Sequence, residues 1–142
     1  MTDNIQKFIT SQTCASVCCI GLQSKLPFCF SCYYAFNSKE GLLFFKSSAT
    51  THHSILISKN PFVSGTILPD KLNSLAVVGI QFEGVVLAAN NPMAAQAFKQ
   101  YHTKHPLALA IAGNMWTIQL THIKMTDSSL GFGKKSIWDK VD

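Results

Sequence analysis

The chain has 142 residues, of which 47% are hydrophobic and only 13% charged, and its net charge is +5. A chain of this length is expected to form one domain, residues 1–142, and to bury a core without needing disulfides or metals. It contains scattered lysines but no arginine. Nucleic-acid-binding proteins usually gather arginine and lysine on one face, so this class is disfavoured. The few charges also favour a homodimer, whose interface would cover apolar surface.

Five cysteines occur early in the chain, at positions 14, 18, 19, 29 and 32. Their odd number, together with a polar N-terminal segment that lacks an apolar targeting core, predicts free thiols in a reducing compartment. The longest apolar runs, such as residues 107–112, are far too short to cross a bilayer. We therefore expect a cytoplasmic protein that is not bound to a membrane.

The first half of the chain predicts two short helices and three strands. Some segments repeat apolar residues at helical spacing, and others are β-branched or aromatic runs. The helices are expected at residues 3–12 and 51–59, and the strands at residues 14–22, 28–36 and 42–46. Gly41 ends a turn-forming segment between the last two strands, which indicates a hairpin with a glycine at positive φ. In the second helix, Ile55 and Leu56 are expected to face inward.

The second half predicts further strands at residues 62–67, 75–90 and 115–125. Asn91 and Pro92 are typical of a helix start, and this helix is expected to run to about residue 103. Pro106 opens a shorter helical segment that Gly113 ends. Hairpins dominate, and strands and helices do not alternate regularly. The pattern therefore predicts a mainly β fold, an antiparallel sheet closed into a barrel with helices outside.

The segment from Lys46 to His53 is a candidate anion site, because a strand ends there, hydroxyl residues follow and a helix begins. The first N–H groups of a helix have no partner within it and attract anions, and hydroxyl side chains extend such a site. The residues that suggest a phosphate site are Ser47, Ser48, Thr50, Thr51, His52 and His53. The same residue types also cap helices, so a purely structural role is the alternative.

A family resemblance covers nearly the whole chain. Residues 28–67, FCFSCYYAFNSKEGLLFFKSSATTHHSILISKNPFVSGTI, resemble the core of the pyridoxamine-phosphate-oxidase-like FMN-binding split barrels. Residues 116–138 are more similar to a smaller group within that family, the bacterial YhbP-like proteins, above all in the motif Leu-Gly-Phe-Gly-Lys-Lys-x-Ile-Trp. The resemblance implies a six-stranded antiparallel split β-barrel of the FMN-binding type, with short outer helices.

The resemblance also implies a cofactor site. In the family, a Ser/Thr-Arg-Lys motif holds the flavin phosphate, the flavin ring lies along a strand, and the other subunit of a homodimer closes the site. The matching positions and the added sources of positive charge are Ser31, Cys32, Tyr33, Tyr34, Lys46, Ser47, Thr51, His52, His53, Trp116, Lys134 and Lys135. Because His52 and His53 stand where permanent cations are expected, FMN binding should be weaker and pH-dependent.

The activity that the resemblance implies is that of an FMN-dependent oxidoreductase, which passes electrons from a reduced nicotinamide donor to an unknown acceptor. No residue is an obvious general acid or base, so whether the protein is an enzyme is left open. One alternative is a non-catalytic split barrel that binds flavin, deazaflavin or haem. The other is a degenerate member that keeps the dimer and has lost its ligand.

Two other clusters are interpreted as structural. Cys29 and Cys32 form a Cys-x-x-Cys, but residues three apart in a strand face opposite sides, so we expect core residues rather than zinc ligands or a redox pair. His102 and His105 lie near a helix end, where interaction with the helix dipole is favoured over metal binding with His122. We therefore expect no metal site.

Overall fold

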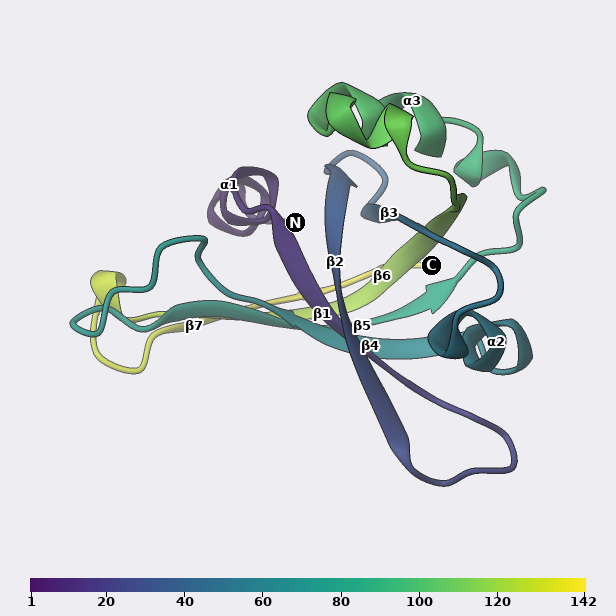
Figure 1. Cartoon of the computed structure of the whole chain (residues 1–142). Helices are drawn as coiled ribbons and strands as arrows, with labels where there is room; N and C mark the ends of the chain where they lie inside the picture. Colours follow the sequence, from purple (N-terminus) through teal and green to yellow (C-terminus); the bar gives the residue numbers. More distant parts are fainter.

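Seven antiparallel strands form the body of the computed structural model, which describes residues 1–142 apart from the side chain of Leu130 (Figure 1). They are β1 (Cys14–Ile20), β2 (Pro27–Asn37), β3 (Leu42–Ser47), β4 (Phe62–Ile67), β5 (Val78–Val86), β6 (Asn114–Asp127) and β7 (Lys135–Asp139). The strand order is β3-β2-β1-β4-β5-β6-β7, and β3 also pairs with β6. That pairing closes six strands into a barrel and leaves β7 outside, which confirms the predicted mainly β split barrel.

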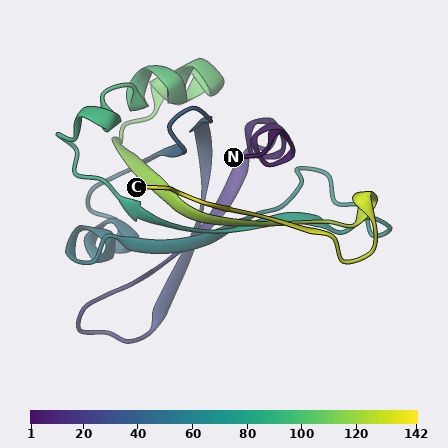
Figure 2. The ribbon, with the colours of Figure 1, turned by 180° about the vertical axis from the view of Figure 1, so that it is seen from behind.

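Short helices surround the barrel. They are α1 (Asp3–Ser11), α2 (His52–Lys59) and α3 (Ala97–Lys104), with 3₁₀ turns η1 (Pro92–Ala94), η2 (Pro106–Ala110) and η3 (Ser128–Leu130). In both Figure 1 and Figure 2, α1 and α3 lie at the top and α2 lies below them. The hydroxyl of Tyr34 on β2 donates to the carbonyl of Ile9 (2.5 Å), and Lys104 on α3 donates to the carbonyl of Gln12 (2.5 Å). These bonds join α1 to the sheet and to α3.

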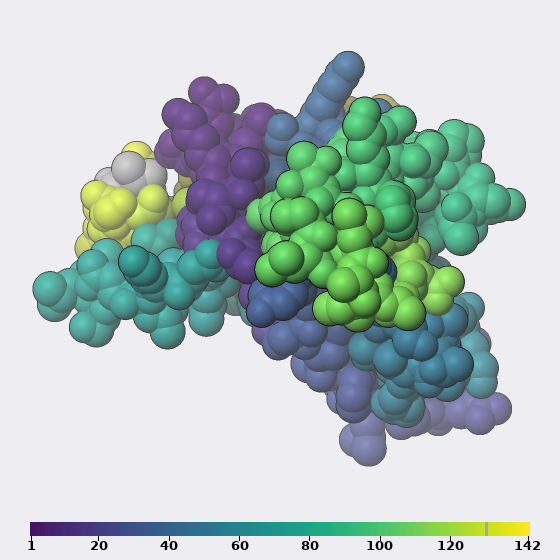
Figure 3. Space-filling model, turned by 45° about the horizontal axis from the view of Figure 1, so that its top comes forward, coloured from purple at the N-terminus to yellow at the C-terminus, as the bar shows by residue number. Residues whose placement is uncertain are grey.

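Apolar side chains alternate along the strands between the barrel core and an outer layer. On β3, Leu43 and Phe45 point into the barrel core, whereas Leu42 and Phe44 point outward. The outward pair packs against α3, which lies over the β2–β3 hairpin (Figure 3). Gly41 in the hairpin turn has a φ of 68°, as predicted, because a side chain is strained in that conformation. Burial of these side chains drives folding.

Strands β2 and β3 separate part-way along the hairpin. Residues 34–37 of β2 pair with residues 42–45 of β3, but residues 27–33 of β2 pair only with β1. Beyond Phe45, β3 continues along β6 as far as the pair Ser47–Asn114. The edge of β2 that faces away from β1 is therefore not taken by β3 over residues 27–33. This opening is the split of the barrel.

Several predicted elements differ from the structure. In α2 the buried residues are Ser54 and Ile57. Leu56 is partly buried against the core, as expected, whereas Ile55 is 45% exposed, so the expectation for Ile55 is wrong. The strand expected at residues 75–90 is limited to Val78–Val86, and the helix expected after Asn91 is split into η1 and α3. The sequence does not predict β7, because the glycines that precede this short strand are typical of a loop.

The cysteine prediction needs correction. Cys18 and Cys29 form a disulfide, because they are opposite each other in the β1–β2 pair, with Cα atoms 4.1 Å apart. Cys14, Cys19 and Cys32 are free thiols, as expected. Across the part of the chain that the structure describes, no helix is long and apolar enough to span a membrane.

Candidate functional site

A groove opens where β2 and β3 separate. It has a volume of about 530 Å³ and lies between β2, the end of β3, the start of α2 and the segment that follows α3. It is lined by Cys14, Phe30, Ser31, Cys32, Tyr33, Lys46, Ser47, Ser48, His53, Tyr101, Ala108, Ile111 and Ala112. This β2 groove brings together half of the residues that the sequence suggested for a cofactor site.

One end of the β2 groove carries hydroxyl and imidazole groups. The hydroxyl of Ser47 lies 2.8 Å from Nε2 of His53. The ring of His53 stacks on Phe30, with centroids 3.8 Å apart and planes 9° from parallel. Burial, and secondarily the neighbouring His52, lowers the pKa of His53 below the ordinary value of 6.5. His53 is therefore a neutral hydrogen-bonding group at pH 7 rather than a cation.

Lys46 is the only lysine among the described residues that line the β2 groove. Its Nζ donates to the carbonyl of Ala108 (2.8 Å) and lies 3.1 Å from Nε2 of His102. Nδ1 of His102 lies 2.8 Å from the carbonyl of Phe98 and donates to it. Nε2 of His102 then accepts from Lys46, so the ammonium group is held in place by two neutral acceptors. The groove thus contains one fixed positive charge.

Thr51 and His52 lie outside the β2 groove. The hydroxyl of Thr51 accepts from the backbone N–H of Ser54 at 3.3 Å, which is the contact of a helix N-cap. His52 is exposed, and its ring makes an edge contact with Phe28 at 4.8 Å between centroids. For these two residues the geometry fits the structural alternative, helix capping and surface packing, better than a phosphate contact within this chain.

The other part of the groove follows β2. Tyr33 is 58% exposed and forms one wall together with Ser31. Burial, and secondarily Cys14, raises the pKa of Cys32 to about 12, so this thiol is not a nucleophile. Tyr34 is fully buried and points into the barrel, but its carbonyl accepts from Nε2 of His105 (2.7 Å). Tyr34 is therefore not among the residues that line the groove.

Trp116, Lys134 and Lys135 are not part of the β2 groove in this chain. Nε1 of Trp116 donates to the carbonyl of Ser47 (3.0 Å), but its ring lines a different pocket. The β6–β7 hairpin, which carries both lysines, extends away from α2 in both ribbon views (Figures 1 and 2). Their role in the site of a partner subunit stays a prediction.

The segment after α3 was missed as a source of site residues. Ala108, Ile111 and Ala112 form the wall opposite β2, and Tyr101 on α3 also contributes. Small apolar side chains carry no chemical signal in the sequence. The hydrogen bond from Lys46 to the carbonyl of Ala108 attaches this segment to β3, and the two residues are 62 positions apart in the sequence.

Comparison with known sequences identifies the family, although no protein-family model matches the chain. It is 35% identical over 112 residues to a UPF0306 protein of Photorhabdus laumondii, which covers 79% of this chain and 78% of that protein. It is 31% identical over 139 residues to a UPF0306 protein of Yersinia pestis, which covers 97% of this chain and 92% of that protein. The chain belongs to the UPF0306 family.

Solved structures place this UPF0306 protein among split barrels. A haem-binding protein of Mycobacterium smegmatis gives a TM-score of 0.77 at 14% identity, over 93% of this chain and 55% of that longer chain. An FAD-binding protein of Mesorhizobium loti gives 0.68 at 12% identity, over 89% and 95%. The haem storage protein HutZ of Vibrio cholerae gives 0.63 at 14% identity, over 96% and 92%. These likenesses establish the fold of the UPF0306 chain.

Proposed function

We propose that this protein binds a flavin, with FMN as the first candidate, in the β2 groove. The observation that carries the proposal is that the split of the barrel joins three features in one cavity. These are an unpaired edge of β2, a wall that includes Ser31, Cys32 and Tyr33, and an end with hydroxyls and one lysine. A flavin mononucleotide needs a slot for its ring and an anion site for its phosphate. The family resemblance and the flavin- and haem-binding structural neighbours support the proposal.

The described residues fit such a cofactor in the following way. Ser47, Ser48 and His53 would hold the phosphate, with Lys46 supplying positive charge nearby. Backbone groups of β2 along Ser31 to Tyr33 would hold the edge of the ring system. The bound flavin would supply hydride and electron transfer. The groove residues would orient the flavin ring and keep water from one of its faces. We also propose that a reduced nicotinamide cofactor donates the electrons to the flavin.

Binding should depend on pH through His53. The pKa of His53 is lowered in the protein alone, whereas a neighbouring phosphate dianion favours the imidazolium form and raises it. Binding therefore takes up a proton, and affinity falls as pH rises from 6 to 8, by at most about tenfold per pH unit. FMN titration followed by flavin fluorescence quenching at both pH values measures this. Absence of saturable binding at both pH values would overturn the proposal.

Matched variants locate the phosphate. Ser47→Ala should weaken FMN binding about tenfold, because a hydrogen bond to a charged group is lost. His53→Gln should remove the fall in affinity with rising pH, since glutamine does not titrate. His52→Gln is the control, because its ring contacts Phe28 outside the groove. Equal effects of the two histidine substitutions would contradict this placement. Riboflavin, which lacks the phosphate, should bind without a difference between Ser47→Ala and the native protein.

Haem is a second candidate, because His53 is a half-buried, neutral imidazole on the groove wall. Neutral imidazole is a common axial ligand of haem iron. On this alternative, reconstitution with haem gives a Soret band that His53→Ala removes and His52→Ala retains. A band that persists in both variants would exclude His53 as the ligand.

The proposal includes a homodimer. Beside the β2 groove, Leu107, Leu109 and Ile111 are 88%, 61% and 65% exposed, which is unfavourable for a free monomer surface. A second copy packed there would cover them and close the groove. Sedimentation should give twice the mass of the 15.6 kDa chain at micromolar concentration, and a mass of one chain would contradict the dimer.

A further inference from the structure

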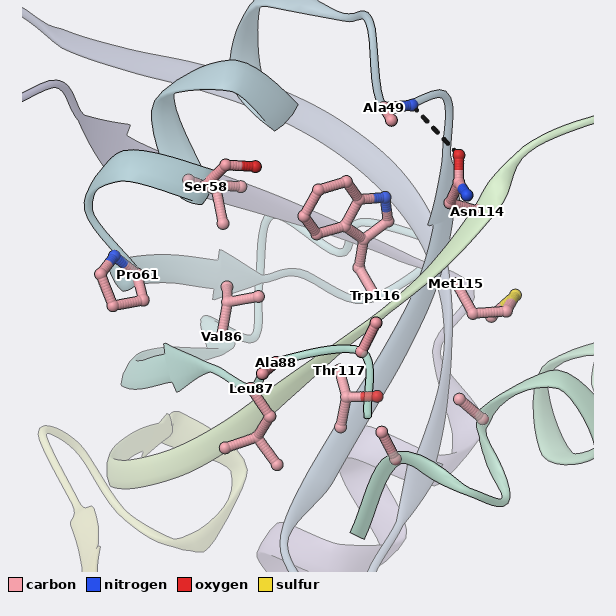
Figure 4. A pocket seen from close by; sticks show the side chains of 14 residues that line it. Ala49, Ser58, Pro61, Val86, Leu87, Ala88, Asn114, Met115, Trp116 and Thr117 are labelled. Atoms are coloured by element: carbon pink, nitrogen blue, oxygen red, sulfur yellow. Dashed lines mark hydrogen bonds between the residues drawn. The ribbon is translucent and has the colours of Figure 1, made fainter. Parts of the chain in front are cut away.

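A second pocket lies on the other side of the loop that follows β3. It has a volume of about 720 Å³ and is bounded by α2, the end of β5, η1 and the start of β6. Figure 4 shows the indole ring of Trp116 in the middle of it, between Ser58 on α2 and Asn114 on β6. We call this cavity the α2–β6 pocket. Of the residues that line it, only Trp116 was assigned to the cofactor site, and its predicted place there is in the site of a partner subunit.

The lining of the α2–β6 pocket is uncharged. None of the described residues that line it is a lysine, a histidine or an acidic residue, and most are aliphatic. Several of the polar side-chain atoms that do occur are already bonded within the chain. Ser58 donates to the carbonyl of Ser54 (2.8 Å), and Oδ1 of Asn114 accepts from the N–H of Ala49 (3.3 Å). A ligand would meet apolar side chains and the face of an indole ring, so a charged ligand would lose its hydration without compensation.

A chain of hydrogen bonds connects this pocket to the β2 groove. Nε1 of Trp116 donates to the carbonyl of Ser47 (3.0 Å), and the hydroxyl of Ser47 lies 2.8 Å from Nε2 of His53. Ser47 is thus bonded to one residue from each cavity. The ring of Trp116 is held from inside the barrel by Phe45, with centroids 6.2 Å apart and planes 14° from parallel. A ligand that moves the indole would therefore break or lengthen its hydrogen bond to the backbone of Ser47.

We propose that the α2–β6 pocket binds an uncharged, apolar aromatic molecule against Trp116, and that its occupancy is transmitted to the β2 groove through Ser47 and His53. The pocket would be a second ligand site of the split barrel, distinct from the flavin site. Its binding and its effect on His53 are measured on the protein alone, so they stand or fall independently of FMN.

Binding is tested with Nile red, an uncharged apolar dye whose fluorescence rises in apolar surroundings. Ala94→Phe places a phenyl ring in the pocket, and Ala95→Phe places the same ring on the exposed neighbouring residue that does not line it. We expect saturable binding that Ala94→Phe weakens at least about tenfold and Ala95→Phe leaves within about twofold. No saturable binding, or equal weakening by both variants, overturns the proposal. Binding that disappears as the chain dimerises also overturns it, because a second copy would then fill the pocket.

Transmission is tested by following the ring protons of His53 by NMR during the same titration. His53→Gln identifies the signal, and His52 provides an internal control on the same helix. We expect the His53 signal to shift with the same saturation curve as dye fluorescence, and Trp116→Phe, which lacks the indole N–H, to abolish the shift. If Trp116→Phe does not fold, Ala94→Phe should reduce the shift in proportion to dye binding. A constant His53 signal at saturation overturns the transmission.

Discussion

Replacement of Gly65 by alanine should destabilise the barrel where three strands meet. Gly65 on β4 lies between Val17 on β1 and Phe82 on β5. A Cβ atom there would lie 2.4 Å from the carbonyl oxygen of Ser16 and 2.4 Å from Cζ of Phe82. The Phe82 ring can turn only into a packed core, and the Ser16 carbonyl is backbone. Both strands must therefore shift to accept one methyl group.

The size of the effect follows from these contacts. Overpacking a core costs about 1–3 kcal/mol, and a clash with backbone belongs near the upper end of that range. For a chain of this length about 3 °C of melting temperature correspond to 1 kcal/mol, so a fall of about 6–9 °C is expected. Thermal unfolding followed by circular dichroism, with urea unfolding as a second measure, tests it.

The matched control is Gly79→Ala on β5, where the nearest atoms to an added Cβ are Cδ2 of Leu68 at 3.3 Å and the carbonyl of Ile67 at 3.4 Å. These contacts are close but tolerable, and alanine lowers the entropy of the unfolded chain, so the change should stay within about 1 kcal/mol. If Gly65→Ala melts within about 2 °C of the native protein, the packing between β1, β4 and β5 is looser than described.

Three other substitutions test separate contacts. Tyr34→Phe should cost about 1–3 kcal/mol in urea unfolding, because the carbonyl of Ile9 loses its buried donor; no change would mean that water replaces the hydroxyl. Cys29→Ser should lower stability by about 3 kcal/mol, estimated from the 11-residue separation, and a reductant should lower the native protein to the same level but leave the variant unchanged. Thr51→Ala should cost about 1 kcal/mol through the lost cap of α2 without changing FMN affinity, and a loss of affinity would place Thr51 in the phosphate site.

Much of the fold could be predicted from local patterns in the sequence. The β2–β3 hairpin follows from two aromatic runs around a turn. Gly41 stands in that turn because the backbone there has a positive φ, which glycine adopts without strain. The boundaries of β7 could not be predicted, because that strand exists through its pairing with the long strand β6. The disulfide could not be predicted either. Its pairing depends on the register of β1 against β2, and a shift of one residue would place Cys19 opposite Cys29.

The structure brings predicted site residues together only where their proximity in the sequence is kept in the tertiary structure. Ser47 and His53 are close in the chain and remain close in the fold, where both line the β2 groove. That they share an anion site stays a prediction. Thr51 and His52 lie between them in sequence, but the turn of α2 directs both away from the groove. The role of His102 in holding Lys46 could not be seen, because 56 residues separate them.

The pairing of β3 with β6 has a consequence for how the chain folds. The contacts from Leu42–Gln119 to Ser47–Asn114 join segments that are distant in sequence, whereas the β2–β3 and β5–β4 pairs are local. Formation of distant pairs is slow because the intervening chain must first be ordered. Barrel closure should therefore be a late step, during which the apolar strand β3 presents an open edge. A nascent chain that has not yet reached Asn114 cannot cover that edge and should be the species most prone to aggregate.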